Sequence, residues 1–279
     1  MSNTLSSSLI TTILVLSLLH LSSFHRNLAA KHAHHSYSSG TLHHHYHHRI
    51  PSSYKTSKAT TFNVSNPRLE QAYIALQAWK SVIFSDPKNF TSDWVGPSVC
   101  NYTGVFCAPL PNATEPTITV AGIDLNKGNI AGLLPIELGL LSDLALIHLN
   151  SNRFCGTIPQ TLSNLSLLFE LDVSNNRFVG PFPNVVLSLP SLHYLDIRYN
   201  EFEGALPPSL FSKTLDAIFV NNNMFTFSIP SNLGGSSATV LVFANNNFGG
   251  CLPPSISNFA DTLEELVLIN TSLVWVSAT

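Results

Sequence analysis

A sequence pattern recurs about every 24 residues from residue 118 onward, and it constrains the fold of this 279-residue chain more than any other feature. Each copy has spaced leucines, an apolar pair that flanks one residue, and then asparagine, phenylalanine, glycine and proline. The clearest copies begin at Leu141, Leu165 and Leu189. The asparagine position recurs at Gly128, Asn152, Asn176, Asn200, Asn223, Asn246 and Thr271. This regularity predicts a chain of similar, stacked coils.

Each position of the repeat has a physical role. The apolar pair forms a short strand whose alternate side chains point inward, and the asparagine satisfies buried backbone groups where the chain turns. Phenylalanine fills the core, glycine supplies a tight bend and proline ends the strand. One coil cannot bury its apolar face alone, so neighbours must stack. The pattern predicts an α/β solenoid of leucine-rich repeats, a right-handed superhelix with a parallel sheet on its concave face.

Residues 63–117 are predicted to form a small N-terminal cap on the solenoid. Asn66 followed by Pro67 is typical of a helix start. Apolar side chains then recur every three or four residues, which predicts an amphipathic helix over residues 67–84. A loop between Cys100 and Cys107 follows, and in a secreted chain these two cysteines predict a disulfide. The repeats occupy residues 118–279, and the last one is broken.

The first 62 residues divide into two segments. The apolar run from Leu9 to Leu21 is too short to span a membrane, and no later segment reaches spanning length. Residues 1–30 are therefore predicted to be a signal peptide, with an uncleaved anchor as the alternative. Residues 31–62 are rich in histidine and serine, which predicts a disordered, weakly basic spacer. Adhesion of this spacer to acidic wall polysaccharide is a second hypothesis.

Composition excludes several classes of protein. Only 10% of residues are charged while 44% are hydrophobic, which argues against a charged disordered chain and against a nucleic-acid binder with a basic patch. The first 60 residues hold five basic side chains and no acidic one, so the rest of the chain carries eight basic and all sixteen acidic residues. An acidic body favours a basic partner.

One column of the predicted sheet concentrates acidic side chains on the concave face. Four positions before each asparagine position stand Asp124, His148, Asp172, Asp196, Phe219, Val242 and Val267. Glu170 and Tyr194 fall in the adjacent column. Stacked carboxylates repel one another, and His148 or a ligand cation would relieve that repulsion. Two interpretations follow: a cradle for a basic peptide, or a solvated polar face. The candidate peptide-binding residues are Asp124, His148, Glu170, Asp172, Tyr194, Asp196, Arg198 and Phe219.

No motif in the sequence predicts catalysis or a cofactor. A nucleophile elbow, a helical metal-binding motif and a phosphate-binding loop are all missing from the sequence. His148 near Asp172 is better explained as a pair of surface strand residues than as part of a catalytic triad. We expect neither a metal nor a catalytic residue.

Two more cysteines and six glycosylation sequons remain. Cys155 and Cys251 lie four coils apart, roughly 19 Å at strand spacing, so they cannot pair with each other. Cys155 is either buried and inert or forms an intermolecular bond that would give a homodimer. The Asn-x-Ser/Thr sequons begin at Asn63, Asn89, Asn101, Asn112, Asn164 and Asn270, and after a signal peptide several are expected to be glycosylated.

Several segments resemble the leucine-rich-repeat extensin-like cell-wall proteins of plants. They are residues 66–80, 120–126, 149–156 and 198–204, while residues 100–107 resemble the N-terminal cap of the wider class of plant extracellular leucine-rich-repeat proteins. The resemblance covers about residues 66–271. It implies a secreted, non-enzymatic glycoprotein of the plant cell wall that takes part in wall organisation and growth control. It also implies that the repeats bind small basic cysteine-containing peptides of the rapid-alkalinisation-factor type.

The sequence also departs from this family. Family members continue into further repeats and a Ser-Pro-Pro-Pro module, whereas this sequence stops at Thr279, which predicts a truncated product or a fragment. In the family a cysteine of the next repeat stacks on Cys251, and that position is expected to be Val276 here. The alternative functions are an inhibitor of pectin-degrading polygalacturonases, a truncated inactive product and a receptor ectodomain fragment, the last lacking support from any membrane span.

Overall fold

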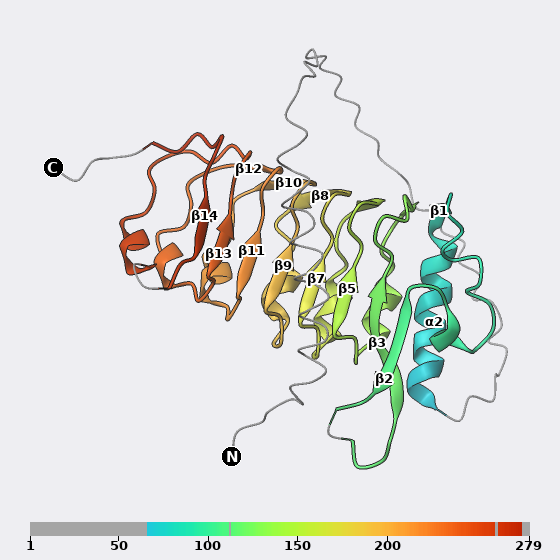
Figure 1. Ribbon diagram of the computed structural model, residues 1–279. Helices are drawn as coiled ribbons and strands as arrows, with labels where there is room; N and C mark the ends of the chain where they lie inside the picture. The colour runs from blue at the N-terminus through green and yellow to red at the C-terminus, as the bar shows by residue number, and fades with distance from the viewer. Residues whose placement is uncertain (1–65, 112, 260–261, 275–279) are drawn as a thin grey trace. The chain divides into compact units, whose positions relative to one another are not determined.

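The computed structural model describes residues 66–111, 113–259 and 262–274 (Figure 1). The predicted signal peptide, residues 1–30, and the predicted spacer, residues 31–62, lie outside these ranges. The N-terminal cap and the repeats belong to one unit of the chain.

The apolar pairs of the repeats form the larger sheet, as predicted. This eight-stranded sheet has the order β14-β13-β11-β9-β7-β5-β3-β2. Its strands are β2 (Val105–Pro109), β3 (Ile118–Asp124), β5 (Leu146–His148), β7 (Glu170–Asp172), β9 (Tyr194–Asp196), β11 (Ala217–Phe219), β13 (Val240–Val242) and β14 (Glu265–Val267). Neighbouring strands are parallel except β2 and β3, which pair antiparallel at the N-terminal end. The sheet therefore presents one strand per repeat along the solenoid.

A second sheet, which the repeat pattern did not predict, runs beside the first. It is six-stranded with the order β1-β4-β6-β8-β10-β12. Its strands are β1 (Ile83–Ser85), β4 (Ala131–Gly132), β6 (Arg153–Gly156), β8 (Arg177–Pro181), β10 (Glu201–Gly204) and β12 (Met224–Phe225). Strands β6, β8 and β10 contain both the phenylalanine and the glycine of the repeat. Gly180 has a φ of 89°, so the predicted glycine bend is confirmed inside this sheet.

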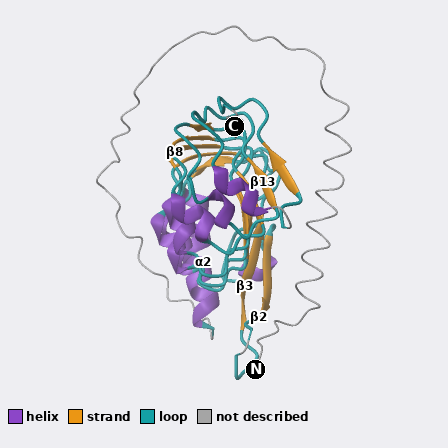
Figure 2. Cartoon of the chain, turned by 90° about the vertical axis from the view of Figure 1, so that its left-hand side faces the viewer, coloured by secondary structure: helices purple, strands orange, loops and turns teal. Residues whose placement is uncertain are grey.

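Short 3-10 helices complete the coils of the repeats, most of them on the side away from the larger sheet (Figure 2). They are η2 (Ile136–Leu140), η3 (Gln160–Asn164), η4 (Asn184–Ser188), η5 (Pro208–Ser212), η6 (Leu233–Gly235) and η7 (Pro254–Phe259), while η1 (Val99–Asn101) belongs to the N-terminal cap. The proline of the repeat precedes the first helical residue of η2, η3, η4 and η5. Proline thus ends the extended segment and begins the turn.

The core lies between these layers and is built from stacked copies of the same residues. Phe154, Phe178, Phe202, Phe225 and Phe248 are all buried. The rings of Phe178 and Phe202 stack with centroids 6.3 Å apart, and those of Phe225 and Phe248 do the same. This continuous column confirms that each coil needs its neighbours to bury its apolar face.

The asparagine of each repeat joins its own coil to the preceding one. In Asn200, Nδ2 donates to the carbonyl oxygens of Val173 and Ile197, at 3.0 and 3.1 Å. Its Oδ1 accepts from the backbone N–H of Phe178 at 3.0 Å. Equivalent contacts are made by Asn152, Asn176, Asn223 and Asn246. The predicted role of this asparagine is confirmed.

The N-terminal cap contains the predicted helix, but the helix is shorter than predicted. Helix α2 spans Pro67–Ser81, and the side chain of Asn66 accepts a hydrogen bond from the N–H of Arg68. The prediction of a helix to residue 84 was wrong, because Ile83–Ser85 pairs instead with β4 of the second sheet. Buried Trp79 lies 5.8 Å from the ring of Phe154, so α2 packs against the first phenylalanine of the core column.

Candidate functional site

The pairing register places the predicted column as the repeat spacing implied. Asp124, His148, Asp172, Asp196, Phe219, Val242 and Val267 follow one another on neighbouring strands. Glu170 and Tyr194 are register partners in the adjacent column, also as predicted. Inward-pointing neighbours such as Ile147 and Leu171 belong to the core, so these columns occupy the opposite face of the sheet. That face is the candidate site.

His148 is engaged within the face rather than with Asp172. Its Nε2 lies 3.1 Å from Oε1 of Glu170, which comes from the next strand and the adjacent column. Burial lowers the pKa of His148, but the hydrogen bond and charge of Glu170, with Asp172 and Asp124, outweigh it and leave the pKa raised. The raised pKa favours the protonated imidazole, and in that form His148 would offset part of the carboxylate repulsion beside Glu170.

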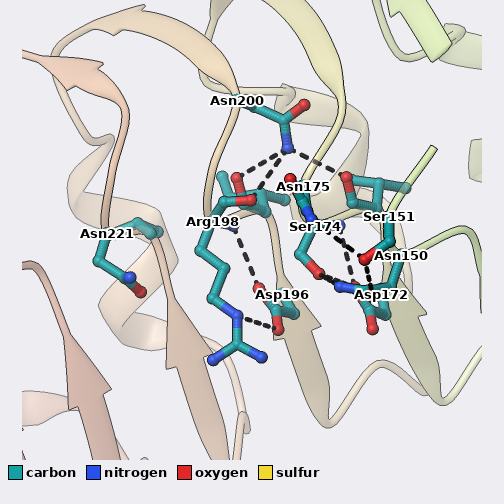
Figure 3. A network of polar contacts seen from close by, with 12 residues as sticks. Asn150, Ser151, Asp172, Ser174, Asn175, Asp196, Arg198, Asn200 and Asn221 are labelled. Atoms are coloured by element: carbon teal, nitrogen blue, oxygen red, sulfur yellow. Dashed lines mark hydrogen bonds and ion pairs between the residues drawn. The ribbon is translucent and has the colours of Figure 1, made fainter. Parts of the chain in front are cut away.

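Asp172 is anchored by the residues that follow its strand (Figure 3). Its Oδ1 accepts from the backbone N–H and from Oγ of Ser174, at 2.9 and 2.5 Å. Ser174 Oγ also accepts from Nδ2 of Asn150 at 2.6 Å. Burial raises the pKa of Asp172, although the Ser174 hydrogen bonds and the charges of His148 and Arg198 lower it in part.

The position of Asp196 in the column predicted a carboxylate that faces solvent, but the structure buries it. Its side chain is fully buried and its Oδ2 lies 3.0 Å from Nε of Arg198. Burial and the charge of Asp172 raise the pKa of Asp196 well above its usual value, against the opposing charge of Arg198. The third carboxylate of the predicted column is therefore paired with the cation of Arg198, two residues farther along the chain.

Beyond β9 the same face is apolar except for the exposed Glu265 of β14. Ala217, Phe219 and Val242 pack together in a cluster separate from the main core, with half-buried Tyr194, Val240 and Val267 around them. The ring centroids of Tyr194 and Phe219 are 5.5 Å apart. The guanidinium carbon of Arg198 lies 5.1 Å from the centroid of Phe219, which is cation–π distance. Phe219 was a candidate residue for peptide binding. The sequence analysis did not predict the apolar cluster around it, although Val242 and Val267 of this cluster belong to the same predicted column as Phe219.

Asn221 is a residue that sequence reasoning missed. It is 8% exposed, and its Oδ1 has no hydrogen-bond partner among the described residues. It follows β11 at the position that Arg198 occupies after β9, as the backbone bonds from Asn175 to Arg198 and from Tyr199 to Asn221 show. Asn221 stands out because no hydrogen-bond donor lies near its Oδ1 among the described residues. A sequence pattern does not reveal such a missing partner.

The polar groups of this face do not form a catalytic or metal-binding arrangement within the described part of the chain. Ser174 Oγ contacts Asp172 and Asn150, whereas His148 contacts Glu170, so no serine is paired with the histidine. Among residues 66–111, 113–259 and 262–274, no three His, Cys, Asp or Glu side chains are grouped to hold a metal ion. The face can offer charge, hydrogen bonds and apolar contact to a ligand.

The predicted disulfide is present, and the other two cysteines are free. Cys100 and Cys107 are bonded, with Cα atoms 5.5 Å apart. Cys155 is half-buried, with its Sγ 3.7 Å from the carbonyl oxygen of Gly132, and Cys251 is exposed. The residue paired with Cys251 is Val274 rather than the expected Val276, because the spacing of 25 residues that relates Val242 to Val267 falls to 23 residues at this bridge.

The predicted glycosylation sites are exposed wherever the structure describes them. The exposed asparagines are Asn89, Asn101, Asn164 and Asn270. Asn63 and Asn112 lie outside the described residues. None of the helices that the structure describes has the length and apolar character needed to cross a membrane.

Comparison with known families agrees with the cap and the repeats. The model of the leucine rich repeat N-terminal domain matches residues 69–108, and that of the leucine rich repeat matches residues 191–212 and 237–259. Among solved structures, the Arabidopsis receptor kinase HAESA in complex with the peptide hormone IDA superposes with a TM-score of 0.62. It is 27% identical, over 71% of this chain and 33% of that one.

Curated relatives come from one group of plant proteins. Leucine-rich repeat extensin-like protein 3 of Arabidopsis thaliana is 66% identical over 73% of this chain and 27% of its own length. Leucine-rich repeat extensin-like protein 6 of the same plant is 64% identical over 75% of this chain and 45% of its own length. The chain thus spans less than half the length of these two relatives, and the similarity concerns the cap and the repeats.

Proposed function

We propose that this chain, whose repeat domain belongs to the leucine-rich repeat extensin-like family, binds a small basic secreted peptide on its concave face. The observation that carries the proposal is the acidic surface formed by Asp124 of β3 and by Glu170 and Asp172 of β7. HAESA, a repeat protein of the same fold, was solved with a peptide hormone. We propose a peptide of the rapid-alkalinisation-factor type, because such peptides are basic and the family resemblance implies them.

The charge balance of the face supports a cationic ligand. On strands β3 to β9 it contains four carboxylates, from Asp124, Glu170, Asp172 and Asp196, against the cations of Arg198 and, when protonated, His148; Glu265 lies apart from them on β14. Arg198 pairs directly with Asp196, and His148, when protonated, pairs directly with Glu170. No ion pair among the described residues involves Asp124 or Asp172, which leaves these two carboxylates for a ligand cation. A ligand cation placed over these two side chains would relieve their repulsion and gain electrostatic attraction.

The proposal is tested by removing this charge without changing side-chain shape. The double variant Asp124→Asn/Asp172→Asn keeps an oxygen for the bonds to Asn126 and Ser174. We expect it to bind a synthetic, oxidised, basic cysteine-containing peptide about tenfold more weakly or worse in calorimetry. The matched control Glu201→Gln/Glu203→Gln removes two exposed carboxylates from β10 of the second sheet and should keep native affinity.

The result also separates this proposal from its alternatives. Equal affinity of the native chain and the Asp124→Asn/Asp172→Asn variant, or no binding by the native chain, would overturn it. Inhibition of a fungal polygalacturonase without peptide binding would instead favour the inhibitor class. A non-enzymatic role is part of the proposal, and it is supported by the separate partners of His148 and Ser174.

We also propose that the chain is a secreted glycoprotein of the plant cell wall that takes part in wall organisation and growth control. The exposed sequons and the Cys100–Cys107 disulfide support passage through an oxidising compartment. Loss of mass on treatment with a peptide N-glycosidase would test secretion of the chain made in plant cells. The half-buried Cys155 leaves the proposed homodimer open to a test by gels run with and without reductant. Binding of the histidine-rich spacer to wall polysaccharide stays a proposal as well.

A further inference from the structure

The concave face changes its chemistry at one place, between β9 and β11. In the first column, Asp124, His148, Asp172 and Asp196 are followed by Phe219, Val242 and Val267. The adjacent column changes at the same strand, from Glu170 and Tyr194 to Ala217 and Val240, although Leu146 and Glu265 at its ends break the pattern. The residues after the strands run Asn150, Ser174, Arg198, Asn221, Ala244 and Ile269. The face therefore has a polar half and an apolar half.

The apolar half is organised as a surface of its own. Ala217, Phe219 and Val242 form a cluster that is separate from the main core of the solenoid. Tyr194, Val240 and Val267 pack around it and are only half-buried, so apolar surface remains at its edge. The inward side of the same strands already contributes Ile218 and Leu241 to the core, so the fold does not require a second apolar layer. Grouped apolar side chains on the outer face of a sheet indicate a binding surface.

Groups at the boundary can hold a ligand that crosses it. Arg198 pairs with Asp196 on one side and lies against the ring of Phe219 on the other. Next to it in the register, Oδ1 of the buried Asn221 is a hydrogen-bond acceptor without a partner among the described residues. An unsatisfied buried acceptor destabilises the fold, so a ligand N–H at this point would stabilise the complex.

We infer that the ligand carries a cationic side chain and an apolar side chain about four residues apart, docked on the polar and apolar halves of this face. Asp172 and Val242 are separated by three strand spacings, roughly 14 Å, and an extended peptide covers that distance in about four residues. The peptide would run across the strands, along the solenoid. This inference rests on the proposed function, because it assumes that a peptide binds to this face. It adds the spacing of the cationic and apolar side chains in that peptide.

The test selects ligands from a library without assuming their sequence. A phage-displayed library of random 12-residue peptides is panned on the full chain, and in parallel on the variant Val242→Thr/Val267→Thr. The control variant Val179→Thr makes the same change on β8 of the second sheet, where the valine is exposed. Circular dichroism and thermal melting confirm that each variant is folded before panning.

We expect the native chain and the Val179→Thr variant to enrich peptides with Lys or Arg three to five positions from Leu, Ile or Phe. The Val242→Thr/Val267→Thr variant should enrich the cation alone. For a recovered peptide, replacing its apolar residue by Ser should weaken binding to the native chain roughly tenfold, and to this variant less than about twofold.

The other outcomes overturn one claim or both. Enrichment of cations alone by the native chain, or an apolar preference that survives Val242→Thr/Val267→Thr, would overturn the two-part inference and leave the proposed function standing. Absence of any cationic enrichment by the native chain would overturn the proposed function as well.

Discussion

At the scale of single residues, the concave face is shaped by how its carboxylates are compensated. Asp196 and Glu170 each have a cationic partner within 3.1 Å, whereas Asp172 is held by hydrogen bonds from Ser174. The positions of these acids follow from the repeat spacing alone. Their partners do not, because the pairing of His148 with Glu170 depends on side-chain conformations across two columns. Sequence reasoning therefore found the acids and overestimated the charge they offer to a ligand.

These carboxylates should make the stability of the chain depend on pH. Burial raises the pKa of Asp172 and Asp196 in the folded state, so between the ordinary aspartate pKa and the raised values the folded chain binds more protons than the unfolded chain. The free energy of unfolding then falls as pH rises through that window. His148, whose pKa is also raised, acts in the same direction at higher pH. Thermal melting in buffers from pH 4.5 to 8 should give the highest Tm in mild acid.

A conservative substitution isolates the contribution of Asp196. Asp196→Asn has no carboxyl to titrate, so its Tm should change less between pH 4.5 and 8 than that of the native chain. The control Asp216→Asn alters an aspartate whose side chain is 67% exposed and should keep the native profile. A Tm of the native chain that rises steadily toward neutral pH would contradict the assigned burial of these acids.

At the scale of elements, the coils are joined by the asparagine contacts and by the stacked phenylalanines. One asparagine side chain satisfies two carbonyl oxygens and one N–H drawn from adjacent coils. A coil that loses it leaves buried backbone groups without partners, whereas a coil that loses a surface asparagine does not. The solenoid's stability should therefore be concentrated in this column.

Asn200→Ala measures that contribution. We expect the free energy of unfolding to fall by about 2–4 kcal/mol, since several buried backbone groups lose their partners. Asn247→Ala is the matched control, because Asn247 is exposed and its Oδ1 accepts a single side-chain bond, from Ser272. It should change stability by about 0.5 kcal/mol or less. Equal losses in urea unfolding of the two variants would show that the asparagine column is not what joins the coils.

The elements also show what the sequence could predict. The strands of the larger sheet followed from the apolar pairs, and the Asn66 cap followed from its neighbour Pro67. The second sheet was missed because its strands are as short as two residues and have no alternation of their own. The end of α2 was misplaced because Ile83 continues the helical spacing while its backbone pairs with Gly132.

At the scale of the whole molecule, a continuous apolar core supports a face that is divided into two chemistries. The same repeat that stacks the core also fixes which outer side chains lie beside one another, so the face could be listed by column before the structure was known. The change from polar to apolar side chains between β9 and β11 can be read from the sequence of the column, where Phe219 follows Asp196. Its meaning became evident only with the separate cluster of Ala217, Phe219 and Val242, and with Arg198 lying between the two halves.

The most direct measurement is to find where a bound peptide lies on the chain. Photoreactive benzoylphenylalanine is introduced in place of Tyr194, which lies at the boundary of the two halves, or in place of the exposed Val179 on the second sheet. Each chain is irradiated with a synthetic, oxidised, basic cysteine-containing peptide. We predict that the peptide forms a covalent adduct with the chain substituted at position 194 and forms no adduct with the chain substituted at position 179. An excess of a competing peptide of the same sequence should suppress the adduct at position 194. Adducts at position 179 alone, or at neither position under conditions where calorimetry shows binding, would contradict peptide binding on the concave face.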